Sequence, residues 1–258
     1  MLQGTLQEMT VVQKLKDAGL YKEGDPNDLK NSFVEEDQVY LGDKGPYTRS
    51  KVSYYDIKLF ADQLEAKIEQ LDPLIQAVYA KNAELLVTMM RVVNKETKQG
   101  FRGTSGNGNE LDFILGAARS FYDPDNSAVA RTKWERTISS TGAKWFIEGA
   151  TASSQLVMAE EEALIVLGLY NQALDPCVDS IQVRKNSNDA NVQDVDFDQV
   201  QENKGSPLIE LRTPFILPPE EQGWIKAYYY QTGTDEMQPI SMWIRQAKNL
   251  RDLTDLIP

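Results

Sequence analysis

Residues 57–92 read IKLFADQLEAKIEQLDPLIQAVYAKNAELLVTMMRV, and this stretch decides how the helical part of the chain is built. Side chains that are nearly all apolar recur in it at alternating steps of four and three residues. The series, called the heptad seam below, is Ile57, Ala61, Leu64, Ile68, Leu71, Ile75, Val78, Asn82, Leu85, Met89 and Val92. Such spacing places the side chains on one stripe of a helix, which then packs against other helices in the same chain or in another copy.

The seam is interrupted near its middle. Pro73 has no backbone N–H to donate and restricts the residue before it. We therefore expect two helices, over 53–71 and 73–96, with Ser53 capping the first and Asp72 capping the second. The second helix carries apolar side chains on several sides beyond the seam, so it is expected to be a core or interface helix.

Asn82 stands at an a position of the heptads, where leucine or valine is usual. A buried amide there either fixes register and oligomer number by demanding a matching partner or bonds to nearby backbone within the monomer. Both readings stay open. The residues expected to form contacts between subunits are Ile57, Leu64, Ile68, Ile75, Asn82, Leu85 and Met89.

Residues 1–52, before the seam, read as an extended arm with one short helix. Thr10 can cap a helix from Val11 to Ala18, and Gly19 can end it. The rest of the arm has too few apolar residues for a core of its own. It must lie on its own body or on a neighbouring subunit, and the sequence leaves both possibilities open.

The stretch from Gly100 to Asn109 holds four glycines and is expected to be a connector or contact loop. It lacks the Gly-Lys-Ser/Thr ending of a phosphate-binding loop. Asn109 can cap a helix from Glu110 to Tyr122, which would complete a helical region over 53–136. One face of that helix would be Leu111, Phe113, Ile114, Ala117 and Phe121.

From about residue 137 the apolar period changes to two, and β-branched and aromatic residues take over. The predicted strands are Lys144 to Glu148, Gln155 to Ala159, Ala163 to Asn171, Asp179 to Lys185, Val192 to Val200, Leu208 to Leu217, Trp224 to Gln231 and Ile240 to Arg245. No helical pattern separates them, which favours an antiparallel β-sandwich or jelly-roll-like domain over 137–245. Residues 246–258 would form a short helix or a contact tail. The fold class expected is therefore α+β.

Composition excludes several function classes. The 258 residues hold 27 Lys and Arg against 39 Asp and Glu, a net charge of −12, so direct nucleic-acid binding is not expected. Histidine is absent, which removes Ser-His-Asp and Cys-His catalysis and His-ligated zinc. Cys177 is the single cysteine and is expected to be a plain thiol. With no transmembrane segment and no signal-peptide pattern, we expect a soluble protein made in the cytoplasm without a cleaved signal peptide.

Two groups of carboxylates suggest chemistry. Asp194, Asp196 and Asp198 alternate along one predicted strand and could ligate calcium, although the glycine and glutamate of an EF-hand loop are missing. The other reading is an amphipathic strand with an acidic face. Glu160 to Glu162 suggest the carboxylate pair of a glycoside hydrolase, but consecutive strand residues face opposite ways, so a charged turn is preferred.

One predicted strand carries aromatic residues on both faces. Trp224, Tyr228 and Tyr230 share one face, and Ile225, Ala227 and Tyr229 share the other. An exposed aromatic row can stack on sugars, whereas a covered row belongs to a core or to a contact with a neighbour. We favour the second reading.

An arm, a heptad-bearing helical region, a glycine loop and a terminal β-sandwich resemble, in overall layout, the structural proteins of virus and phage particles. The resemblance implies a non-enzymatic, self-assembling capsid, neck or fibre component without a cofactor. Its partners would be copies of itself and other proteins of the same assembly. The alternative is a carbohydrate-binding or adhesin-like β-sandwich on a helical stalk, using Trp224, Tyr228 and Tyr230. A histidine-free carboxylate hydrolase is the third reading.

Overall fold

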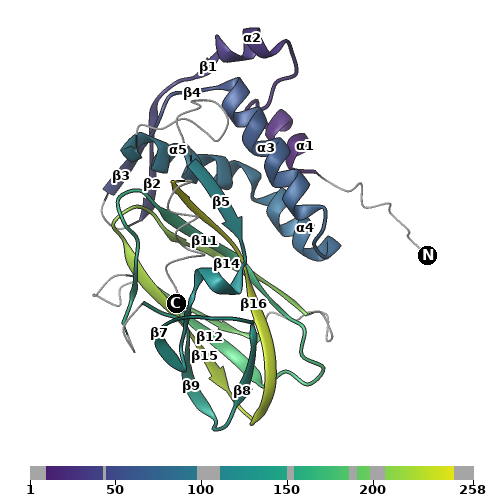
Figure 1. The fold of residues 1–258 in the computed structure, drawn as a ribbon, viewed down its shortest axis with the longest axis vertical. Coiled ribbons are helices and arrows are strands. Elements are labelled where there is room, and N and C mark those ends of the chain that lie inside the picture. The colour runs from purple at the N-terminus through teal and green to yellow at the C-terminus, as the bar shows by residue number, and fades with distance from the viewer. Residues whose placement is uncertain are drawn as a thin grey trace, which may run out of the picture.

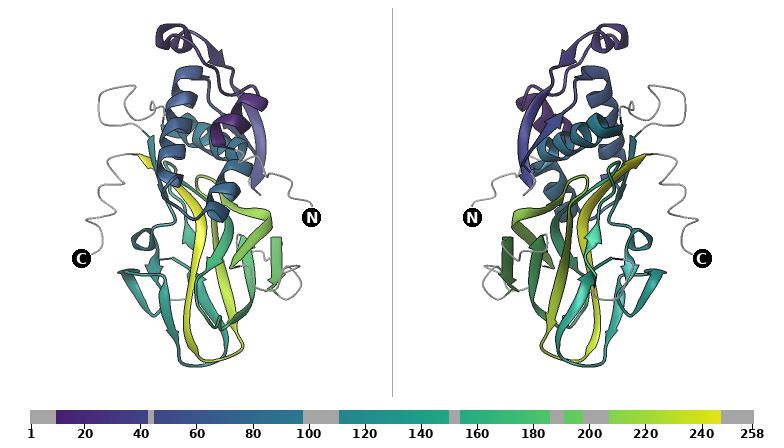
Figure 2. Two further views of the ribbon diagram at one scale, coloured as in Figure 1. Left: turned by 90° about the vertical axis from the view of Figure 1, so that its right-hand side faces the viewer. Right: turned by 90° about the vertical axis from the view of Figure 1, so that its left-hand side faces the viewer.

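The computed structural model describes residues 10–42, 45–97, 111–149, 154–185, 191–197 and 207–246. In these ranges the chain forms helices and antiparallel sheets, which confirms the predicted α+β class. The longer helices gather at one end of the molecule, and the strands form two packed sheets beyond them (Figures 1 and 2). Within the described residues, no helix has both the length and the apolar character needed to cross a bilayer.

The helices of the described chain come mostly from its first hundred residues. They are α1 (Val11–Asp17), α2 (Pro26–Lys30), α3 (Tyr54–Ile68), α4 (Pro73–Lys81) and α5 (Ala83–Thr97), and a single 3₁₀ turn, η1 (Ala118–Ser120), lies farther along. 

Short strands accompany these helices, and longer strands follow them. The early strands are β1 (Phe33–Val34), β2 (Asp37–Gly42), β3 (Gly45–Arg49) and β4 (Val52–Ser53). The later ones are β5 (Leu111–Leu115), β6 (Tyr122–Asp123), β7 (Asn126–Ala130), β8 (Glu135–Ile138), β9 (Gly142–Ile147), β10 (Leu156–Val157), β11 (Ala163–Asn171), β12 (Val178–Lys185), β13 (Asn191–Asp196), β14 (Leu208–Leu217), β15 (Gln222–Tyr229) and β16 (Gly233–Gln246).

Two five-stranded antiparallel sheets make up the β-sandwich. The sheet next to the helices, called the inner sheet, has the order β14-β11-β16-β5, and β8 also pairs with β16. The other, called the outer sheet, has the order β10-β15-β12-β13, and β9 also pairs with β15. The molecule is therefore built in three layers: helices, inner sheet and outer sheet.

A hydrophobic core lies on each face of the inner sheet. Ile165 and Leu167 of β11 pack toward the helices, whereas Leu164 and Val166 pack toward the outer sheet. Every residue of β11 is buried, which explains its nearly continuous apolar sequence. A register shift beside Gly168 lets β14 approach so closely that a Cβ there would lie 2.6 Å from the Ile209 carbonyl oxygen.

The helix starts were predicted correctly. The Ser53 hydroxyl accepts from the Asp56 backbone N–H at 3.1 Å and caps α3. Asp72 accepts from the Leu74 N–H at 2.9 Å, and Pro73 stands at the first position of α4. These caps satisfy backbone donors that the first helical turn leaves open.

The prediction of one helix over 73–96 was wrong, because the helix is interrupted at Asn82. This residue lies between α4 and α5 with φ −100° and ψ 13°. Its side-chain amide donates to the Val78 carbonyl at 2.8 Å, so the asparagine offers the backbone a local alternative to continuing the helix. The break lets α5 turn and lie across β3 and β16.

The predicted helix over 110–122 is also wrong. Where the structure describes that range, it shows β5, the η1 turn and β6. Phe113 of β5 pairs with Ile244 of β16, a partner that no local pattern reveals, and Gly116 ends the strand with φ +43°. The change from helix to strand thus comes near residue 111 and not near residue 137.

The predicted strands are confirmed with small shifts of their ends. Those over Ala163 to Asn171 and Leu208 to Leu217 have the predicted bounds, whereas β16 begins at Gly233, well before the expected Ile240. Three predicted segments lie outside the described residues: the glycine-rich loop from Gly100 to Asn109, the end of the strand expected to reach Val200, and the tail beyond Gln246.

The described part of the N-terminal arm packs on its own chain. The helix predicted after Thr10 is present as α1, and its Val11 and Leu15 are fully buried against the helical layer. The β2–β3 hairpin is fastened by the buried Arg91, which donates to the Ser50 carbonyl at 3.0 Å and to the Glu35 carbonyl at 2.5 Å.

Candidate interaction surfaces

The residues of the heptad seam are mostly used within the chain's own core. Ile57, Leu64 and Met89 are fully buried, and Ile68 and Ile75 are nearly so. They belong to the core between the helices and the inner sheet. Asn82 and Leu85 are half-buried. The buried members of this stripe are therefore used by the chain's own core, and Asn82 and Leu85 are its partly accessible members.

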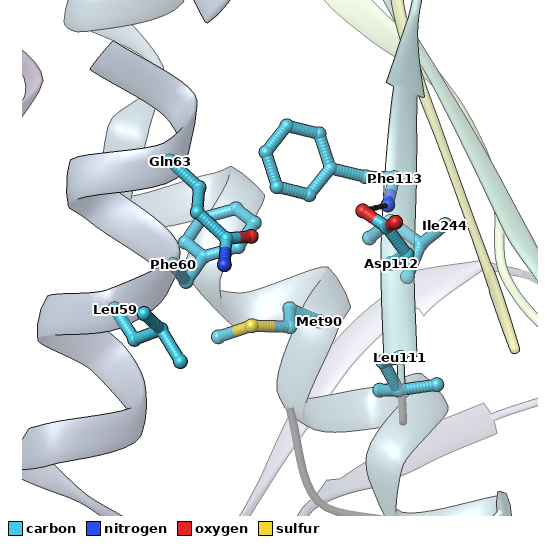
Figure 3. A pocket seen from close by; sticks show the side chains of 8 residues that line it. All are labelled: Leu59, Phe60, Gln63, Met90, Leu111, Asp112, Phe113 and Ile244. Carbon is cyan, nitrogen blue, oxygen red and sulfur yellow. Dashed lines mark hydrogen bonds between the residues drawn. The ribbon is translucent and has the colours of Figure 1, made fainter. Parts of the chain in front are cut away.

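A slot remains where the helices meet the edge of the inner sheet (Figure 3). Its cavity volume is only about 10 Å³, and it is lined by Leu59, Phe60, Gln63, Met90, Leu111, Asp112, Phe113 and Ile244. At its polar end Asp112 accepts from the Phe113 N–H at 2.8 Å, and the Lys67 ammonium donates to the Phe113 carbonyl at 2.6 Å. Asp112 and Lys67 are thus engaged within the protein, and the slot is a packing gap between layers.

A larger cleft of about 410 Å³ lies at the end of the sandwich, between the loop before β12 and the start of β16. Cys177 borders it, and burial, followed by the nearby Asp235 and Asp175, raises the pKa of this thiol. Its backbone N–H donates to the Asp235 carboxylate at 3.2 Å. A raised pKa disfavours the thiolate, which is the nucleophilic form of cysteine.

Arg131 is another ionisable group with a shifted pKa, and packing explains the shift. Burial lowers its pKa to about 10. The guanidinium lies 4.7 Å from the centre of the Trp134 ring and 5.3 Å from that of Phe146, and it donates to the Phe146 carbonyl at 3.2 Å. It is a structural cation held between aromatic rings.

The three consecutive glutamates form a turn, as preferred from the sequence. Glu160 is exposed, whereas Glu162 is buried and accepts from Arg245 and from the Trp243 indole N–H. Glu162 thus holds neighbouring strands together.

The aromatic residues of β15 alternate as predicted over most of the strand. Trp224 and Tyr228 face outward from the sandwich, and Ile225, Ala227 and Tyr229 face the core between the sheets. Tyr230 does not continue the row. It follows the strand, is 55% exposed, and its hydroxyl donates to the Pro176 carbonyl at 2.9 Å.

A residue that the sequence did not single out joins Trp224. Trp145 of β9 packs against it with ring centres 5.3 Å apart and an interplanar angle of 72°. The Lys226 ammonium lies 4.3 Å from the centre of the Trp145 ring and 4.7 Å from that of Trp224. Because the lysine covers both indoles and Trp224 is only 9% exposed, the pair is not an open stacking platform.

The strand register extends this face across the outer sheet. One row runs from Trp145 through Lys226 and Gln182 to Asp194, and the next runs through Tyr228 and Ser180 to Asp196. The outer face, defined by these residues and by Arg184, therefore passes from aromatic to cationic to acidic. Within the described residues no ion pair is recorded for Lys226 or Arg184.

The proposed calcium ligands are only partly described. Asp194 and Asp196 are exposed on the outer face of β13, with Val195 buried between them, whereas Asp198 lies outside the described residues. Among the side chains that the structure describes, no three His, Cys, Asp or Glu residues gather as a metal site would require.

Comparison with known proteins adds no assignment. No protein-family model matches the chain, and no curated protein matches its sequence. Function must therefore be argued from the order of the strands and from the surfaces described above.

Proposed function

We propose that the protein is a non-enzymatic, self-assembling structural protein and a component of a virion, such as a capsid, neck or fibre protein. The observation that carries this proposal is the order of the strands. The first and last long strands, β5 and β16, lie side by side in the inner sheet, and β9 and β10 lie beside β15 in the outer sheet. From β5 to β16 the chain crosses repeatedly from one sheet to the other.

This connectivity supports a jelly roll, in which β5, β16, β11 and β14 face β9 and β10, β15, β12 and β13. Jelly rolls are common in viral capsid proteins and also occur in lectins and cupins, so the step from fold to virion is one of analogy. The apolar side chains on the surface are consistent with contacts to other protein molecules. Several large apolar side chains are exposed, namely Phe33, Tyr40, Leu74, Val157, Leu174 and Tyr230.

The test of this proposal is self-association of the purified full chain. We expect light scattering to show a mass that rises above that of the 29.1 kDa monomer as protein concentration increases. A protein that stays strictly monomeric at millimolar concentration would contradict the proposal.

A carbohydrate-binding role is the second candidate, and the half-exposed Tyr228 on the outer face favours it, whereas Lys226 covers Trp145 and Trp224. A glycan array separates the two functions. A sugar-dependent signal that disappears in Tyr228→Ala but survives in Tyr40→Ala, an exposed tyrosine on the distant β2 strand, would support the lectin. Absence of any signal would leave assembly as the only role of this face.

A further inference from the structure

The outer face carries both signs of charge in a fixed geometry. Lys226, Gln182 and Asp194 stand directly opposite one another on the neighbouring strands β15, β12 and β13. Lys226 and Gln182 are half-exposed, and Asp194 is exposed. The cation and the carboxylate therefore lie on either side of a neutral amide, about 4.8 Å away in each direction.

Self-association of this chain must overcome its charge. Each copy carries a net charge of −12, so two copies repel unless the contact brings opposite charges together. A surface with a cation on one side and a carboxylate on the other can bring opposite charges together when it packs against an identical surface.

We propose that the outer face docks on the outer face of a second copy through a two-fold axis that runs parallel to β12 above Gln182. This inference rests on the proposed self-assembly and names the surface that performs it. Such an axis exchanges the positions of β15 and β13, so Lys226 of each copy faces Asp194 of the other. Gln182 meets its own counterpart, and its amide can both donate and accept there.

The neighbouring row agrees with the same axis. Tyr228 and Asp196 flank Ser180, so the tyrosine hydroxyl of one copy faces the carboxylate of the other. Within its own copy this hydroxyl donates to the Gln182 amide oxygen at 3.4 Å, and on docking it can donate to the carboxylate instead. Arg184 lies two residues from Gln182 along β12, so the axis also brings it close to its own counterpart, and its long side chain must turn away diagonally toward Asp194 of the second copy. An axis perpendicular to the strands is more strongly disfavoured, because it would place Lys226 on Lys226 and Asp194 on Asp194 and would form neither opposite-charge pair.

The geometry suits sheet packing. Sheets that pack face to face lie about 10 Å apart with strands nearly aligned, a distance that lysine and aspartate side chains can span together. The Lys226 ammonium lies over both the Trp145 and Trp224 rings, which limits the side-chain entropy lost when the contact forms.

Charge reversal tests the pairing by sedimentation equilibrium of the full chain. Lys226→Glu and Asp194→Lys should each weaken association about tenfold or more, because each places like charges face to face twice. The double variant Lys226→Glu/Asp194→Lys restores both pairs and should associate nearly as the unchanged protein does. Arg212→Glu is the matched control for Lys226→Glu, because it makes the same change of charge at an exposed position of β14 in the inner sheet. It should have little effect on association.

The outcomes separate this inference from the proposed function. If the unchanged protein is monomeric throughout, the proposed function fails and the inference fails with it. If the unchanged protein assembles but both single variants assemble equally well, only the docking of the outer face is overturned. Weakened single variants that the double variant does not rescue would overturn the pairing of Lys226 with Asp194. Asp194 is exposed, so its replacement tests the pairing even if Lys226→Glu were to disturb the fold.

Discussion

Asn82 shows how a residue that looks exceptional in sequence can have a local role. The heptad spacing left two readings of it, and the structure satisfies its amide on the Val78 carbonyl of its own helix. The spacing predicts which residues face the core, because that depends only on helical period. It cannot predict whether the helix continues, since that depends on the competition between one side-chain hydrogen bond and the next helical turn.

Replacing Asn82 with leucine tests this role. We expect Asn82→Leu to lower the free energy of unfolding by about 1 kcal/mol, the usual net worth of one such hydrogen bond. The oligomeric mass should not change, because the amide is bonded within the monomer. Urea denaturation and light scattering measure the two effects, and a changed oligomeric mass would show that the amide acts between copies.

The buried tyrosines predict a loss of stability in alkali. Burial raises the pKa of Tyr229 to about 12 and raises that of Tyr79 as well, whose hydroxyl donates to the Ser241 carbonyl at 2.7 Å. In the unfolded chain both phenols ionise near pH 10. The folded state therefore holds more protons above pH 10, so its stability is complete below that pH and falls as the pH rises toward 12.

The slope of that loss should reach roughly 1.4 kcal/mol per pH unit for each buried tyrosine. Tyr229→Phe removes one titrating group, so its stability should fall less steeply between pH 10 and 12 than that of the unchanged protein. Denaturant titrations at several pH values measure both slopes. Parallel curves would show that Tyr229 has the same pKa in the folded and unfolded states.

Strands and helices differ in how far local sequence determines them. The bounds of β11 could be predicted, because burial on both faces demands an unbroken apolar run that ends at turn residues. The LDFIL segment of β5 could not be assigned correctly, since five residues fit a helical face as well as a strand. Its pairing with β16, which comes much later in the chain, decides its structure.

The β2–β3 hairpin is held partly by one buried side chain, that of Arg91, beside contacts such as the hydrogen bond from the Tyr47 hydroxyl to Glu221 at 2.8 Å. Arg91→Met should leave the Glu35 and Ser50 carbonyls without their guanidinium donor and cost about 3 kcal/mol. Hydrogen exchange measured by mass spectrometry should become faster in Asp37–Arg49 and stay slow in β11. Unchanged exchange in the hairpin would show that Arg91 does not hold it.

Arg49→Met is the matched control for that experiment. The Arg49 guanidinium binds Asp37 near the surface, where an ion pair is typically worth 1 kcal/mol or less. Its loss should accelerate exchange much less than the loss of Arg91, which is buried.

At the scale of the whole molecule, the sequence predicts the fold class and most of the strands of the sandwich. It does not predict the contact of Trp145 with Trp224, because that depends on the register between β9 and β15. The same holds for the row from Lys226 to Asp194, whose members come from three strands. Periodicity gives the face on which a residue lies, but only the sheet order gives its neighbours.

The position of β16 also bears on how the chain folds during synthesis. Within the described residues, β5 and β8 find their sheet partner only in β16, and β11 needs β16 on one side. Until the ribosome has made Gly233–Gln246, the inner sheet lacks a central strand, and the helical layer has no complete surface to cover. The pairs of β5, β8 and β11 with β16 form late and join segments that are far apart in the sequence. Closing such long loops slows folding and leaves apolar strands exposed for longer. A nascent chain stalled before Gly233 should therefore be a target for chaperones, whereas release of β16 should complete both cores together.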